Sequence, residues 1–188
     1  MSRLLDPYMP RPDVSDLHEV MVEAPAEFVF RTACDFDMES LAAVRAIIRL
    51  REVLLGAARK ERRPAGIIED TLRMGWGKLE EEVGRHYAAG AACRPWEGNV
   101  VFHPIPAEQF STYAHPGEVK ITWTLEVEAL APARSRLTVE TRAAATDAAA
   151  RLKFRRYWRW ASPGIRLIRR LLLSAVRRKA EREWQRRA

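Results

Sequence analysis

The stretch "EVKITWTLEVEALAPARSRLTVETRAAATDAAARLKFRRYW", residues 118–158, carries the clearest secondary-structure signals of the chain. Apolar and polar residues alternate from Val119 to Glu128, which predicts a strand with one buried face. After the APAR turn the alternation returns over residues 136–143, with Leu137 and Val139 facing inward. The two segments therefore predict a long antiparallel hairpin whose other face is exposed to water.

The alternation also predicts which way three side chains of this hairpin face. Trp123 lies in the middle of the first strand on the inward face, so we expect it to face the helix that follows the hairpin. Glu140 and Arg142 fall on the outward face of the second strand, where the hairpin could place them opposite Thr124 and Thr122. We interpret them as cross-strand pairs on the surface.

A long helix is predicted directly after the hairpin, over about residues 146–186. Thr146 and Asp147 offer an N-cap oxygen and a negative charge in the first turn. Pro163 and Gly164 are expected to interrupt the helix, which then resumes with an apolar stripe opposite an arginine-rich face. We expect this helix to return across the inner face of the sheet.

Upstream of the hairpin the pattern switches between strand and helix. Residues 1–16 predict an extended lead-in, and residues 17–23 predict a strand with His18, Val20 and Val22 on one face. Residues 24–37 and 38–56 predict two helices, the second ending at Gly56. The remaining expectations are strands within residues 67–96 that turn near residues 83–85, a strand at residues 99–103, and a short helix or loop at residues 106–117.

Composition predicts one globular domain over residues 17–188, with its positive charge concentrated at one end. The chain has 188 residues and a net charge of +7, but residues 151–188 alone carry +12, so the preceding 150 residues are net negative. Two cysteines set no disulfide framework and favour a reducing cytoplasm. We expect neither a signal peptide at residues 1–16 nor a membrane-spanning segment.

Two segments resemble a known family. "HEVMVEAPAEFVFRTACDFD" (residues 18–37) and "VETRAAATDAAARLKFRRYWRWASPGIRLIRR" (residues 139–170) are similar to polyketide cyclase/dehydrase-type members of the START-like, or SRPBCC, superfamily. The resemblance implies an α+β helix-grip fold, in which a curved antiparallel sheet wraps around a long C-terminal helix and two short helices follow the first strand. It also implies an apolar cavity between sheet and helix for a lipid, a polyketide or a similar molecule.

Aromatic residues are the candidates for lining such a cavity. An aromatic side chain can cover a ligand or fill a core, and the sequence leaves both uses open. The candidates for ligand binding are Trp76, Tyr87, Trp96, Phe102, Trp123, Phe154, Tyr157 and Trp158.

His18 and Tyr87 are the candidates for acid or base catalysis. An inward histidine can serve as a general base or anchor a ligand, and the alternative is a hydrogen-bonded core or rim residue. The histidines and cysteines show no regular metal-ligand spacing, so the sequence predicts no metal site. No Gly-x-Ser-x-Gly elbow and no glycine-rich phosphate loop occurs, and no cofactor is predicted.

The favoured function is the binding or carrying of a hydrophobic small molecule in a cavity between the sheet and the C-terminal helix. The alternatives are an enzyme of polyketide cyclase or dehydrase type and a membrane-surface module. Residues 165–180, with Leu171, Leu172 and Leu173 beside arginines, suit an anionic membrane surface. Nucleic acid is disfavoured, because Tyr157, Trp158 and Ala161 are spaced to pack inward rather than to stack on bases.

Overall fold

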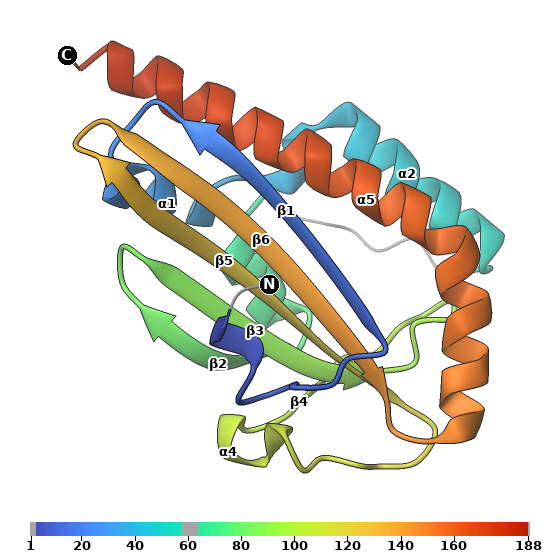
Figure 1. Ribbon diagram of the computed structural model, residues 1–188. Coiled ribbons are helices and arrows are strands. Elements are labelled where there is room, and N and C mark those ends of the chain that lie inside the picture. The colour runs from blue at the N-terminus through green and yellow to red at the C-terminus, as the bar shows by residue number, and fades with distance from the viewer. Residues whose placement is uncertain (1–2, 58–63, 188) are drawn as a thin grey trace.

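The computed structural model describes residues 3–57 and 64–187, and within them the chain is an α+β protein (Figure 1). The described strands form one six-stranded antiparallel sheet in the order β1-β6-β5-β3-β2, with β4 paired to β3, and the sheet is not closed. The elements are η1 (Arg3–Leu5), β1 (Val14–Val22), α1 (Ala26–Cys34), η2 (Met38–Ser40), α2 (Ala42–Leu54), α3 (Ile67–Arg73), β2 (Gly77–Glu82), β3 (His86–Cys93), β4 (His103–Pro104), α4 (Ala107–Phe110), β5 (Val119–Ala131), β6 (Arg134–Ala145) and α5 (Ala148–Gln185).

The predicted hairpin is formed by β5 and β6. Thr122 lies opposite Arg142 and Thr124 lies opposite Glu140, which is the register expected from the alternation. Trp123 faces the same side as α1 and α5, where it packs against the main core. Strand period and turn position were therefore sufficient to predict how these two strands pair.

The outward face of the hairpin is buried over the part that holds Glu140 and Arg142, so the surface prediction for these two residues was wrong, whereas Glu128 nearer the turn is exposed. Both residues have 0% relative exposure. The segment before β1 covers them: Leu5 and Met9 are buried there in a cluster with Leu79 and Phe110. Residues 3–13 thus include η1 and pack on the sheet instead of forming a free extended lead-in, and β1 already begins at Val14.

The connection between α2 and β5 departs from the predicted pattern in two places. Residues 67–73 form α3, a helix that the sequence did not predict. The strand expected at residues 99–103 is reduced to the two residues of β4. Pro104 and Pro106 keep this strand from extending further along the chain, because proline cannot donate a ladder hydrogen bond. The tight turn between β2 and β3 is present, with Gly84 at a φ of 84°.

Helix α5 runs from Ala148 to Gln185 without the predicted interruption, and Pro163 lies inside it. The side chain of Asp147 accepts a hydrogen bond from the backbone N–H of Ala150, which confirms the N-cap. Figure 1 shows α5 bent into two straighter parts. A proline inside a helix removes one backbone hydrogen bond and commonly produces such a bend.

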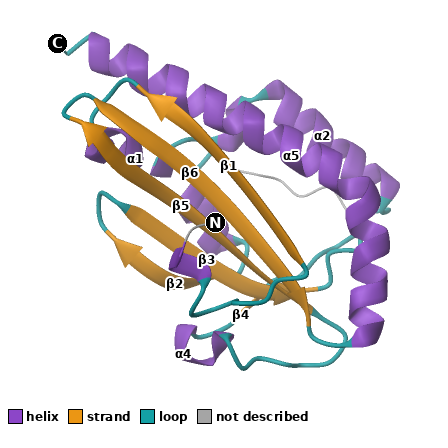
Figure 2. Ribbon diagram, viewed as in Figure 1, coloured by secondary structure: helices purple, strands orange, loops and turns teal. Residues whose placement is uncertain are grey.

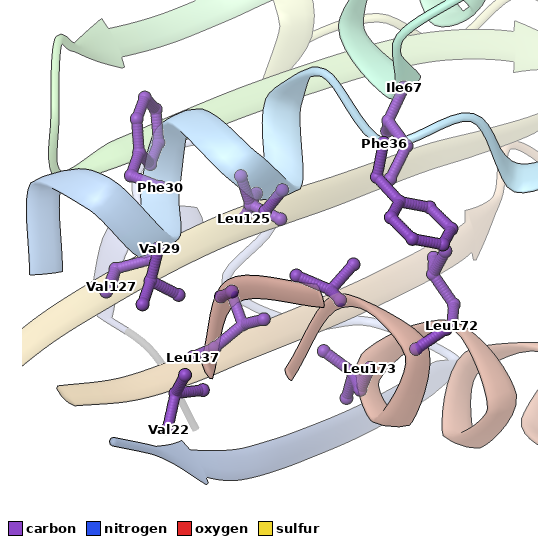
Figure 3. Packing of buried hydrophobic residues seen from close by; sticks show 14 of the residues in the cluster. Val22, Val29, Phe30, Phe36, Ile67, Leu125, Val127, Leu137, Leu172 and Leu173 are labelled. Carbon is purple, nitrogen blue, oxygen red and sulfur yellow. The ribbon is translucent and has the colours of Figure 1, made fainter. Parts of the chain in front are cut away.

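Most of α5 runs along the β1 side of the sheet, while α1 covers the central strands β5 and β6 (Figure 2). The main core lies between these layers: Val29 of α1 lies beside Val127 of β5, Phe30 points from the other side of α1, and α5 adds Leu172 and Leu173 (Figure 3). Among the described residues, no helix is both long enough and apolar enough to cross a bilayer.

Candidate functional site

Two neighbouring rows of residues cross the inner face of the sheet, the face that α1 and α5 cover. Each row contains one residue from β1, β6, β5 and β3, and adjacent strands lie about 4.8 Å apart. A row therefore extends over about 14 Å from the β1 edge to β3. The strand register places Asp16, Thr141, Trp123 and Ala89 in the first row and His18, Val139, Leu125 and Tyr87 in the second.

The β1 end of these rows holds a cluster of charged side chains, which we call the Asp16 cluster: Asp16, His18, Arg166 and Arg169. Asp16 Oδ2 accepts a hydrogen bond from Arg169 Nη1 at 2.6 Å and lies 3.2 Å from His18 Nε2. Asp16 Oδ1 lies 3.3 Å from Arg166 Nε. The side chains of Asp16, His18 and Arg169 are each less than 15% exposed, so the cluster lies mostly inside the protein.

The Asp16 cluster has more positive than negative charge. Two guanidinium groups, which stay protonated in proteins, share a single carboxylate with an imidazole. Burial lowers the pKa of the Arg169 guanidinium, Asp16 opposes this shift, and the positive charge of Arg166 adds to it. A partly buried cluster with an unbalanced positive charge attracts an anion, because the anion would complete the missing pairing.

The other end of the rows is aromatic. The rings of Trp123 and Tyr87 lie 5.7 Å apart, centroid to centroid. In its row Trp123 stands between two smaller residues, Ala89 and Thr141. Trp123 is half-buried, whereas Tyr87 is only 1% exposed. This end can cover an apolar group with an aromatic surface.

Two buried polar groups on aromatic residues of the main core have no hydrogen-bond partner among the described residues. They are the hydroxyl of Tyr87 and Nε1 of Trp76. Burial, with smaller contributions from Glu81 and Cys34, raises the pKa of Tyr87, so the hydroxyl stays protonated and can donate a hydrogen bond. Unpaired buried donors are costly, and a ligand with an acceptor atom would remove this cost.

The eight aromatic candidates fall into two groups instead of one. The main core includes or contacts three of them: Trp76, Tyr87 and Trp123. The ring centroid of Phe102 lies 5.0 Å from that of Trp76. The other four form a second group, in which Trp96 packs against three residues of the N-terminal part of α5: Phe154, Tyr157 and Trp158. Phe154 is 1% exposed, and the hydroxyl of Tyr157 accepts a hydrogen bond from Arg51 Nε at 3.3 Å. These contacts give Phe154 and Tyr157 a packing role.

The two catalytic candidates do not meet. His18 and Tyr87 occupy opposite ends of the second row, about 14 Å apart by strand spacing, so they cannot act on the same atom. The cysteines offer no activated nucleophile either. Burial raises the pKa of both Cys34 and Cys93 to about 12, which keeps the thiols protonated.

Sequence reasoning missed three members of the Asp16 cluster, although signals for two of them were present. Asp16 precedes His18 by two residues and therefore shares its face of β1. Arg169 follows Ile165 by four residues, which puts it on the apolar stripe of α5. Arg166 had no such signal, because only the packing of α5 on β1 brings it to Asp16.

Comparison with known proteins assigns no family to this arrangement. No protein-family model matches the chain, and no curated protein matches it. Three solved structures share distant similarity. A conserved protein from Geobacillus kaustophilus has 12% identity and a TM-score of 0.39 over 92% of this chain and 96% of its own. A hypothetical protein from Helicobacter pylori has 9% identity and a TM-score of 0.43 over 95% of both chains. Ara h 8.0201 has 12% identity and a TM-score of 0.25 over 86% of this chain and 98% of its own. All three TM-scores are below 0.5, so we base no argument about function on them.

Proposed function

We propose that this protein binds and carries a small amphipathic molecule with an anionic head and an apolar tail, in a helix-grip arrangement like that of START-like proteins. The observation that supports this most strongly is the pair of rows on the inner face. They put the positively charged Asp16 cluster about 10 Å, two strand spacings, from Trp123. That separation suits one ligand with two chemically different ends.

In this proposal each end of the ligand has its own partners. The head group, a carboxylate or a phosphate, pairs with Arg169 and Arg166, where a guanidinium donates two parallel hydrogen bonds. The tail lies along Trp123 and Tyr87. A polar atom within the tail would accept hydrogen bonds from the unpaired Tyr87 hydroxyl and Trp76 Nε1. We place this activity in the cytoplasm, where two free cysteines remain reduced.

The alternative, an enzyme of polyketide cyclase or dehydrase type, is favoured by one specific contact. Asp16 Oδ2 lies 3.2 Å from His18 Nε2, and a carboxylate that orients an imidazole is a common arrangement for a general base. The two functions differ in one measurement. An enzyme would convert an aromatic polyketide substrate, and His18→Gln would abolish turnover without abolishing binding.

A ligand panel with one constant tail tests the carrier proposal. Dodecanoate, dodecanol and dodecyltrimethylammonium share the same chain and differ in the charge of the head, and calorimetry gives each affinity. We expect the protein to bind dodecanoate about tenfold more tightly than dodecanol, because hydrogen bonds to charged groups add about 1.5–3 kcal/mol. The cation should bind most weakly.

Two arginines that follow each other in α5 provide the variant and its control. Arg169→Met should remove the preference for dodecanoate while dodecanol still binds. Arg170→Met should leave it unchanged, because Arg170 is exposed and has no contact with Asp16. Equal effects of the two substitutions, or no binding of dodecanoate by the unmodified protein, would contradict the proposed head-group site. Native mass spectrometry of protein purified from its own host would then name the natural ligand class.

A further inference from the structure

Helix α2 presents an apolar side to solvent. Leu50 is 59% exposed, Val53 78% and Leu54 62%, and they lie within one turn of each other. Val44 is the buried residue of this helix. A shallow groove on the same side is lined by Leu50 and Val53, by two arginines, Arg45 and Arg49, and by Ala42 and Ala46. Surface apolar side chains gathered in this way commonly mark an interaction surface.

The membrane contact expected from the sequence, over residues 165–180, keeps only part of its apolar surface: Leu171 is half-buried, and the other two leucines are buried. Leu172 is 9% exposed and Leu173 is 5% exposed, because both pack into the main core. The exposed apolar residues of α5 that lie near α2 are instead Trp160 and Leu167, at 43% and 48%.

These residues of α5 continue the apolar surface of α2. A Cβ built at Gly164 would lie 3.2 Å from Ile47 Cγ2, so Gly164 marks the line along which the two helices touch (Figure 1). Trp160 precedes Gly164 by four residues and Leu167 follows it by three, which places both on the side of α5 that borders α2. We call the combined surface the α2–α5 face: Leu50, Val53, Leu54, Trp160 and Leu167.

Positive charge surrounds this face. Arg156, Arg159 and Arg170 are exposed, and within the described part of the chain none of them forms an ion pair. Helix α5 contains no acidic residue before Glu181. On α2, Arg45 and Arg49 are also exposed, and Arg45 donates to the carbonyl of Glu39, which leaves its charge unbalanced.

We propose that the α2–α5 face docks on the surface of an anionic lipid bilayer. The apolar side chains enter the boundary between head groups and acyl chains, and the surrounding arginines contact lipid phosphates. Tryptophan favours this boundary because its ring is apolar and its N–H is polar. A second copy of the chain is a poorer occupant, because two faces of the same positive charge would repel each other.

Vesicle flotation with ligand-free protein tests the proposal separately from ligand binding at the inner site. Vesicles of phosphatidylcholine alone are compared with vesicles that also contain phosphatidylglycerol, at low and at raised salt. We expect the protein to float with the anionic vesicles only, and salt should release it because screening weakens surface electrostatics. The absence of flotation at low salt, or equal flotation with neutral vesicles, would overturn the proposal even if dodecanoate binds.

Matched variants locate the contact. Val53→Asp should weaken vesicle binding about tenfold or more, because it removes an apolar side chain that the bilayer would bury. Val83→Asp, at an 87% exposed valine in the turn between β2 and β3, should leave binding unchanged. The double variant Arg49→Gln with Arg159→Gln should weaken vesicle binding about 25-fold, because each lost cation costs about fivefold. The control double variant, Arg11→Gln with Arg94→Gln, should leave vesicle binding unchanged. If the test variants and their controls behave alike, the protein does not bind through this face.

Discussion

Replacing Glu140 by Gln should destabilise the protein strongly, because it would leave a buried guanidinium without the carboxylate that is buried beside it. Glu140 and Arg142 are both fully buried between the hairpin and the N-terminal segment. Arg142 Nε donates to Glu140 Oε1 at 2.8 Å, and its Nη1 donates to Asp6 Oδ1 at 2.7 Å and to the carbonyl of Met9 at 3.1 Å. Gln keeps the shape of Glu but removes the charge.

The expected loss follows from the burial of the pair. Removing one partner of a buried ion pair costs about 3–5 kcal/mol, which is a large part of the 5–15 kcal/mol that stabilises a typical domain. The carboxylate of Asp6 remains, but its side chain is 57% exposed, so water screens much of its interaction with Arg142. We therefore expect about 3 kcal/mol, or a melting temperature about 10 °C lower for a chain of this length.

Urea unfolding followed by far-UV circular dichroism measures this loss. The control is the double variant Glu140→Leu with Arg142→Met, which replaces both charges by apolar side chains and should be much less destabilised than Glu140→Gln alone. A loss below about 1 kcal/mol for Glu140→Gln, or a double variant as unstable as the single one, would refute the argument from unpaired charge.

Two further substitutions test packing and capping. Gly90→Ala should cost about 1–3 kcal/mol in urea unfolding, because a Cβ there would lie 2.4 Å from Phe110 Cε2 and 2.8 Å from Leu79 Cδ1. Asp147→Ala should lower the melting temperature by removing the N-cap of α5. Backbone N–H groups of Ala150 and Gly117 lower the pKa of Asp147 from its ordinary 3.8, so the cap stabilises above that pH and is lost as the pH falls through the lower folded-state pKa. The difference between wild type and Asp147→Ala should therefore shrink on acidification below about pH 4, which thermal melts across this range would show.

The inner face of the sheet could be predicted from the sequence because strand alternation is a local property. His18, Val20 and Val22 share one face of β1 as expected, and Trp123 shares it on β5. The outer face could not be predicted in the same way. Its burial depends on Asp6 and Met9 reaching Arg142 across more than 130 residues, and no periodicity within β6 indicates which distant segment will cover it.

The candidate site was predictable only in part, for a related reason. Aromatic residue type correctly identified Trp123, Tyr87, Phe154 and Tyr157 as inward-facing, but the last two lie on the first part of α5, in a different cluster from the first two. Residue type cannot separate these groups, because both occupy apolar surroundings. The Asp16 cluster joins β1 to α5 across some 150 residues, and a single arginine on an apolar stripe was its only sign in α5.

Helix α5 links the two proposals through residues that follow each other in the sequence. Arg169 points inward to Asp16, whereas Arg170 is exposed. The bend at Pro163 separates the part of α5 that carries Phe154 and Tyr157 from the part that packs on the main core, and Gly164 beside it lets α2 approach closely. If the α2–α5 face rests on an anionic bilayer, the same helix holds the Asp16 cluster close to that interface. An amphipathic anion leaving the bilayer would then meet the arginines first and the aromatic residues of the inner face afterwards. This is also the order along the two rows, from the Asp16 cluster at the β1 end to Trp123 and Tyr87 at the other end.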